Sequence, residues 1–132
     1  MSDKFELVKN YLLDLDLKIV HEDPEEELVI VEDPENGIQN LIVDCEEPIV
    51  ILEQVIMEVP QNPGDFFKRL LQMNRTLVHG AFCLDEDGKL VLFRDTLQLE
   101  NLDLNEMEGS IHALSLALAE YSGELLSYAG KQ

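Results

Sequence analysis

The chain has 132 residues, of which 28 are Asp or Glu and 9 are Lys or Arg, so its formal net charge at pH 7 is −19. Such a charge excludes bare nucleic acid and anionic lipid surfaces as partners, because both would repel the chain. Apolar residues make up 45% of the sequence, as in globular proteins, and no apolar run approaches the ~20 residues that span a bilayer. We therefore expect a single cytoplasmic domain over residues 1–132, without a signal peptide and with Cys45 and Cys83 reduced.

The acidic residues are concentrated in the first half of the chain. Residues 1–63 contain 17 acids and 3 bases, and neither Lys nor Arg occurs between Lys18 and Lys68. No linker rich in Gly, Ser or Pro accompanies this change in charge. The change therefore does not mark a domain boundary.

The N-terminal segment is predicted to be a helix that ends near Asp14–Asp16. Ser2 can cap its first turn, where Asp3 and Glu6 favour the positive end of the helix dipole. Apolar residues recur at the spacing of one helical face, at Phe5, Val8, Leu12 and Leu15.

From Lys18 to Val59 the pattern changes to that of strands. Four stretches rich in β-branched residues are separated by turn sequences, at 19–20, 28–31, 41–43 and 49–59. The tetrapeptide Glu-Asp-Pro-Glu occurs twice, at 22–25 and 32–35, and the second copy precedes Asn36-Gly37, a strong hairpin signal. This region is therefore predicted to be an antiparallel meander.

A second helix is expected to follow, with Asn62 as N-cap, Pro63 at the first helical position and Gly80 as the stop. One face of this helix is apolar apart from a single amide, with Phe66, Phe67, Leu70, Leu71, Asn74 and Leu77. A hairpin then joins 81–84 to 90–93 through Asp85-Glu86-Asp87-Gly88, where Gly88 suits a left-handed turn position.

The last predicted helix has the clearest signals. Asp103 can act as N-cap, with Glu106 three residues later. Apolar residues then recur in steps of four and three, at Met107, Ile111, Leu114, Leu118, Tyr121 and Leu125, and Gly130 with Lys131 suits the end. The fold class is therefore α+β: an antiparallel sheet with three helices, in the order helix, three or four strands, helix, two or three strands, helix.

The sequence contains no recognisable catalytic, cofactor or metal motif. His21, His79 and His112 are far apart, and the acidic turn 85–88 lacks the spacing of a calcium loop. We therefore predict a protein without enzymatic activity and without a cofactor. A metal-binding or enzymatic domain that uses the acidic clusters is an alternative, and it requires divalent cation binding that depends on Asp85 and Asp87.

Asn74 lies within the apolar arc of the second helix, where an amide needs a partner. One interpretation is a side chain bonded to a neighbouring backbone group. The other is an amide pair that fixes the register of this helix against a second copy of the chain.

Three predicted strand segments are apolar on both faces, at 28–31, 49–52 and 90–93. If the three helices cover one face of the sheet, a second subunit or a bound polypeptide covers part of the other. If the helices cover both faces, no second subunit or bound polypeptide is required there. The acidic segment from Glu22 to Glu58 favours a basic, amphipathic peptide as partner.

The element order and four short stretches resemble the Tir-chaperone (CesT-like) family of bacterial class I type III secretion chaperones and the related YbjN-type domains. These stretches are Leu-Leu-Gln-Met-Asn-Arg at 70–75, Leu-Val-His-Gly-Ala-Phe at 77–82, Phe-Arg-Asp-Thr-Leu at 93–97 and Leu-Asp-Leu-Asn-Glu at 102–106. The resemblance implies a small acidic homodimer without catalytic activity, in which an extended client segment lies in apolar grooves. A YbjN-type regulator or adaptor that binds a folded partner is the alternative within the same fold.

Carried over element by element, the resemblance implies two sets of site residues. The expected dimer interface comprises Phe66, Phe67, Leu70, Asn74, Leu77, Leu90 and Leu92. The expected client groove comprises Leu28, Ile30, Ile49 and Ile51.

Overall fold

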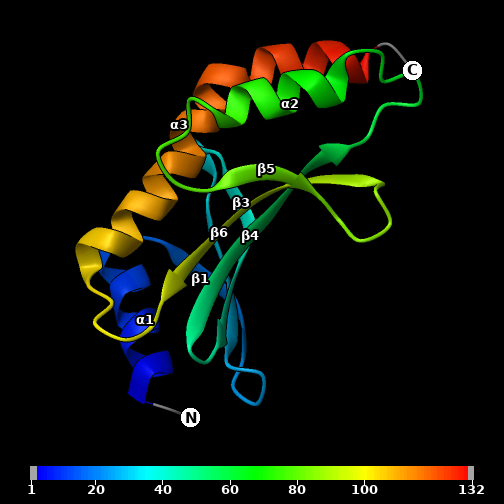
Figure 1. Cartoon of the computed structure of the whole chain (residues 1–132). Helices are drawn as coiled ribbons and strands as arrows, with labels where there is room; N and C mark the ends of the chain where they lie inside the picture. Colours follow the sequence, from blue (N-terminus) through cyan, green and yellow to red (C-terminus); the bar gives the residue numbers. More distant parts are fainter. Residues whose placement is uncertain (1–2, 131–132) are drawn as a thin grey trace.

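The computed structural model describes residues 3–130 and confirms the predicted α+β order (Figure 1). Its elements are α1 (Asp3–Asp14), β1 (Lys18–Asp23), β2 (Leu28–Asp33), a 3₁₀ turn η1 (Pro34–Asn36), β3 (Ile38–Glu46), β4 (Ile49–Glu58), α2 (Phe66–Asn74), β5 (Ala81–Leu84), β6 (Leu90–Gln98) and α3 (Leu104–Ala129). Four strands therefore lie between the first two helices and two between the last two. The predicted cap Ser2 and the terminal Lys131 lie outside the described residues.

The strands form one antiparallel sheet in the order β1-β2-β3-β4-β6-β5. The meander β1 to β4 follows the chain, and β6 then inserts between β4 and the edge strand β5. The register shifts in β1, in the β2–β3 pair and in β4, and such irregularities increase local twist.

One face of the sheet forms the core of the molecule. Residues that alternate along the central strands are buried there, among them Val29, Val43, Leu52, Val91 and Phe93. Side chains directly opposite each other on paired strands share a face, and the register Val29↔Val43↔Leu52 shows this alignment. The alternate residues of the same strands therefore point to the other face.

All three described helices contribute their buried residues to this single core. The long helix α3 spans the molecule, with α1 near its first half and α2 beside its second half (Figure 1). Asp103 caps α3 as predicted, since its Oδ1 accepts a 2.7 Å hydrogen bond from the Glu106 N–H.

The predicted boundaries of α2 were wrong at both ends. The helix begins at Phe66, because Gly64 has a φ of +54° and the Phe66 N–H donates back to the Pro63 carbonyl at 2.8 Å. Asn62 therefore does not cap it. The helix ends at Asn74, well before Gly80, where the Thr76 N–H and hydroxyl both donate to the Met73 carbonyl.

Two glycines are required by the backbone and by close approach of side chains. Gly37 follows η1 with a φ of +80°, and a Cβ there would lie 3.1 Å from Leu118 Cδ1. Gly80 has a φ of +74°, and a Cβ there would collide with the Phe93 ring. Each position combines a left-handed backbone with a packed neighbour.

We predict that Gly80→Ala lowers the free energy of unfolding by about 3 kcal/mol, because the methyl group adds strain and displaces a core ring. Gly123→Ala is the matched control, since Gly123 lies in α3 and a Cβ there meets no atom within 4 Å. It should raise the stability by roughly 0.5–1 kcal/mol through helix propensity. Denaturant unfolding monitored by circular dichroism measures both values, and an unchanged midpoint for Gly80→Ala would contradict the packing described.

Candidate functional site

The face of the sheet opposite the core carries the predicted client-groove residues. Leu28, Ile30, Ile49 and Ile51 all alternate with core residues and are only partly buried. Two neighbours that the sequence did not single out lie on the same face and are more exposed: Ile42 at 37% and Val55 at 55%. Within residues 3–130, every helix packs on the other side, so this apolar surface, here called the open face, has no helical cover.

Asp44 lies on this open face, two residues before the end of β3. Across the sheet it is paired with Leu28 on one side and Ile51 on the other, and along β3 it lies between Ile42 and Glu46. Its Oδ1 atom is buried and accepts no hydrogen bond from any described residue. The Oδ1 atom is therefore without a donor, between apolar side chains on the neighbouring strands and the carboxylate of Glu46.

This setting changes the acidity of Asp44. Burial, followed by the nearby carboxylates of Glu46, Glu26 and Glu53, raises the pKa of Asp44 to about 6. A hydrogen bond between Asp44 and Glu46 also requires a proton on one of the two groups, which favours the neutral form of the pair. Asp44 thus ionises near neutral pH at a cost in stability.

A groove of about 1100 Å³ adjoins the open face between α3, η1 and strands β2–β4. The sheet contributes Ile30, Ile42 and Val55 to its lining, and α3 contributes Leu118 and the 70% exposed Leu126. The groove thus connects the apolar residues of the open face with an apolar stretch of the last helix. No local sequence pattern indicates this groove, because it depends on the placement of α3 relative to η1.

The buried Gln54 side chain holds the strand wall of this groove. Its Nε2 donates to the Gly37 carbonyl at 3.0 Å, and its Oε1 accepts from the Gln39 N–H at 3.1 Å. Both ends of the amide are therefore bonded to the backbone at the start of β3. These contacts fix the junction between η1 and the sheet.

The residues predicted for the dimer interface divide into two groups. Phe66, Leu70 and Leu92 are buried in the chain itself, with exposed fractions of 0%, 5% and 6%. Phe66 packs edge-on against Tyr128, with ring centroids 5.0 Å apart. The first two therefore serve the core within one chain, whereas Leu92 is buried on the open-face side opposite Val55.

The outer surface of α2 and of the segment after it is exposed to solvent. Phe67 is 40% exposed, and Leu71 and Val78, which were outside the predicted interface, are 72% and 86% exposed. The predicted residues Leu77 and Leu90 are half-buried. The α2 surface is therefore defined here as Phe67, Leu71 and Val78.

The structure supports the first interpretation of Asn74, a side chain bonded to a neighbouring backbone group. Its Nδ2 donates to the Phe82 carbonyl at 3.0 Å, and its Oδ1 accepts from the Phe82 N–H at 2.7 Å. The side chain thus pairs with the backbone of β5 as another strand would. It attaches the end of α2 to the sheet edge.

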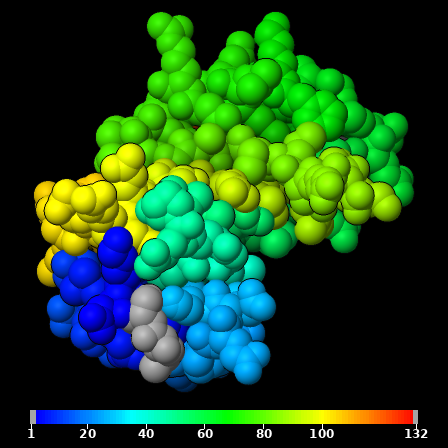
Figure 2. All heavy atoms as spheres, turned by 60° about the horizontal axis from the view of Figure 1, so that its bottom comes forward, coloured from blue at the N-terminus to red at the C-terminus, as the bar shows by residue number. Residues whose placement is uncertain are grey.

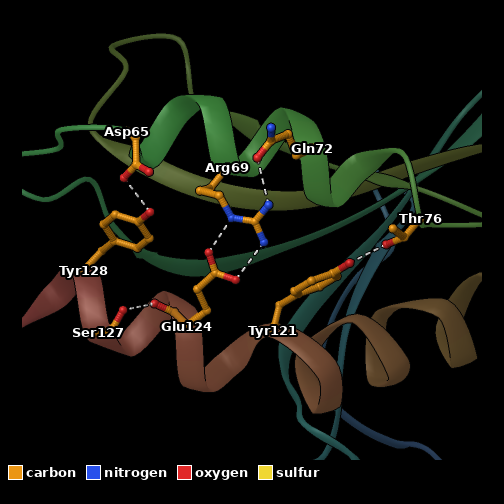
Figure 3. Close-up of polar contacts among 8 residues, drawn as sticks. All are labelled: Asp65, Arg69, Gln72, Thr76, Tyr121, Glu124, Ser127 and Tyr128. Carbon is orange, nitrogen blue, oxygen red and sulfur yellow. Dashed lines mark hydrogen bonds and ion pairs between the residues drawn. The ribbon is translucent and has the colours of Figure 1, made fainter.

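Polar contacts hold α2 against α3 (Figure 3). Arg69 forms a two-pronged pair with Glu124, with N–O distances of 2.6 and 2.8 Å, and this guanidinium lowers the pKa of Glu124. The hydroxyls of Tyr128 and Tyr121 bond to Asp65 and Thr76, at 2.7 and 2.6 Å. The α2 surface is therefore presented by a helix fixed along its whole length.

The acidic turn and the histidines do not come together as a site. Asp85 Oδ1 accepts from the Lys89 and Leu90 N–H groups, at 2.8 and 2.9 Å, as a residue that closes a hairpin does. Among residues 3–130, His, Cys, Asp and Glu side chains form no group of three placed to hold a metal ion. In the same range, each helix is too short or too polar to cross a membrane.

The β3–β4 turn lies at the end of the molecule that carries α1 and the β1–β2 turn, opposite to α2 (Figure 1). Figure 2, in which the bottom of Figure 1 faces the reader, shows this turn (teal) between α1 with the β1–β2 segment (blue) and the segments around α2 (green). The Glu46 carboxylate beside Asp44 lies at the end of β3, next to this turn. Asp44 and Glu46 therefore lie toward this end of the sheet.

Comparison with known proteins gives a family and a fold. Residues 1–131 match the CesT_Tir_1 family. The structure is similar to YbjN, a proposed transcription regulator from E. coli, with a TM-score of 0.69, 12% identity and 92% of each chain covered. No curated protein matches the sequence.

Two solved chaperone complexes share the same fold. The HopA1–SchA chaperone–effector complex matches with a TM-score of 0.62 and 12% identity, over 87% of this chain and 91% of that one. The Yersinia pestis type III secretion chaperone SycH, in complex with a stable fragment of YscM2, matches with a TM-score of 0.53 and 12% identity, over 95% and 98%. At these identities the likeness establishes the fold.

We predict that Asp44→Asn removes a pH-dependent loss of stability. Because the pKa of Asp44 is raised to about 6 in the folded chain, wild type binds a proton that the unfolded chain has released, and stability falls as the pH rises from about 4 to 6. Above this range the variant should be more stable than wild type by about 1 kcal/mol, after allowance for solvent screening.

Denaturant unfolding across this pH range provides the measurement. Glu86→Gln, at the exposed tip of the β5–β6 hairpin, removes the same charge and should follow the wild-type pH profile. Parallel profiles for wild type and Asp44→Asn would show that Asp44 ionises as an ordinary surface carboxylate.

We also predict that Arg69→Gln increases amide hydrogen exchange in α2 while exchange in β1 and β2 stays as in wild type, because the pair with Glu124 is lost. Lys68→Gln, at the neighbouring exposed position, is the matched control and should leave α2 protected. Equal exchange in the two variants would show that the Arg69–Glu124 pair does not hold α2.

Proposed function

We propose that this chain, which belongs to the CesT_Tir_1 family, is a non-enzymatic, single-domain cytoplasmic protein that binds an extended or amphipathic segment of a client protein. The observation that carries the proposal is the open face. Its partly exposed apolar residues continue into the groove beside α3. Contiguous apolar surface of this kind typically marks an interaction site.

A client segment would bind by burying apolar side chains. Leu28, Ile30, Ile49 and Ile51 provide a row of partly buried contacts, and Ile42 and Val55 provide more exposed ones. Each square ångström of apolar area removed from water contributes roughly 25 cal/mol before the cost of ordering the client. The similar fold of SchA and SycH, both solved in complexes with protein partners, supports a polypeptide as the ligand.

We further propose that two copies of the chain associate through the α2 surface. Phe67 and Leu71 are exposed on a helix that Arg69 and Glu124 hold in place, so they need little ordering for association, and Val78 is exposed in the segment after it. Leu77 and Leu90, both predicted for the interface, remain partly exposed. Phe66 and Leu70 would support the seam from inside each chain.

A regulator or adaptor that binds a folded partner is the second candidate. The fold similarity to YbjN, which covers 92% of both chains, favours it. The two functions differ in the state of the partner. A client chaperone still binds the disordered segment when the rest of the client is removed, whereas an adaptor binds only the folded partner.

We predict that Val55→Asp and Ile42→Asp abolish binding of a client segment without unfolding the chain, because both side chains are already exposed and a charge opposes apolar burial. Proteins encoded beside this gene provide the test partners, each as a disordered terminal segment and as a folded whole, with affinity measured by titration calorimetry. Leu13→Asp on α1, 53% exposed, is the control. Binding that survives both variants would place the client elsewhere, and binding of only the folded form would favour the adaptor.

We predict that Leu71→Glu converts a dimer into a folded monomer, because the new carboxylate would be desolvated in the seam. Sedimentation velocity gives the mass, and circular dichroism verifies the fold. Leu116→Glu on α3, where Leu116 is 55% exposed, should leave the dimer intact. A wild-type chain that sediments as a monomer at high concentration would contradict the proposed association.

A further inference from the structure

We infer that the open face recognises a Lys or Arg side chain of an extended partner segment at Asp44, with apolar residues of that segment on either side of the cation. This inference rests on the proposed function and specifies the chemistry of its partner. It makes Asp44 the residue that selects the segment, whereas the surrounding apolar side chains supply contact area.

The position of Asp44 supports this role. It occupies the central point of the apolar row Leu28, Asp44, Ile51 that runs across strands β2, β3 and β4. Its Oδ1 has no hydrogen-bond donor among residues 3–130, and none of the ion pairs described involves it. An acceptor without a partner is costly, and because the Asp44 residue is only partly buried, a cationic donor from outside the chain can approach its carboxylate and reduce that cost.

The charges on this face leave Asp44 without a cation of its own. Arg94 is bonded to Glu53 at 2.9 Å, and Lys18 lies opposite Glu32 on the distant edge strand. The remaining titratable side chains placed here by the register are His21, Asp23, Glu46 and Glu58, together with the thiol of Cys83. Glu26, from the β1–β2 turn, also acts on Asp44.

Apart from Lys18 in β1 and Arg94 in β6, the strands of this face contain no Lys or Arg. Strands β2, β3 and β4 and the whole of α3 contain neither Lys nor Arg, although they contain many acids. A basic side chain therefore meets an attractive potential along this part of the molecule. An acidic or neutral segment gains no such attraction and leaves the Asp44 carboxylate unpaired.

The spacing of the sheet defines the rest of the segment. In an extended chain the side chains at −2 and +2 point to the same side as the central residue, at a separation close to that of alternate strand residues. With the cation at Asp44 and the segment running across the strands, these two side chains lie over the apolar neighbours Leu28 and Ile51. The recognised pattern is thus apolar, any, basic, any, apolar.

Three labelled peptides of about twelve residues test the inference, each with Leu at −2 and +2 and with Arg, Gln or Glu at the centre. Fluorescence anisotropy measures their affinity for the full chain. At a pH near 7.5 the Arg peptide should bind about tenfold more tightly than the Gln peptide, as expected for a charge-assisted bond. The preference should vanish in Asp44→Asn and persist in the matched control Glu86→Gln.

The pH dependence adds an independent readout. Because the cation pairs with ionised Asp44, the affinity for the Arg peptide should fall as the pH is lowered through about 6, while that for the Gln peptide changes little. Equal affinities for the Arg and Gln peptides, both lost in Val55→Asp, would overturn the role of Asp44 and leave the proposed function intact. Failure of all three peptides to bind would overturn both. An Arg preference that survives Asp44→Asn would assign recognition to another acid and overturn the inference.

Discussion

The structure depends on a conflict between strand composition and helix placement. The central strands are apolar on both faces, yet α1, α2 and α3 all bury their side chains in one core on one face. Burial on that side stabilises the chain, and the other side remains apolar surface in contact with water. The open face is thus a direct result of the composition of the strands. Binding of a partner would remove this apolar surface from water.

The acidic composition has a structural counterpart in this arrangement. A net charge of −19 opposes non-specific association through the exposed open face, because like charges repel at long range. The same charges disfavour an additional carboxylate in their midst, which is the position of Asp44. Solubility and selectivity for a basic partner therefore have a common electrostatic origin.

Local patterns in the sequence were sufficient for the element order, because turns and caps are formed by residues close together in the chain. Asp103 caps α3 and Gly88 takes a left-handed turn conformation, both as predicted. The inward side of α2 was not evident, since its apolar arc includes both Phe66 and Phe67, and only one of them enters the core. The setting of Asp44 was also hidden, because its neighbours Leu28 and Ile51 become adjacent only through the strand register.

Gln54 gives the groove beside α3 a further property. Its amide joins the backbone at Gly37 and Gln39, and the φ of Gly37 together with its approach to Leu118 leaves no room for a larger residue there. The wall of the groove is consequently shaped during folding and keeps its form when empty. A ligand that enters meets a preorganised surface, and the entropy of arranging this wall has been lost before the encounter.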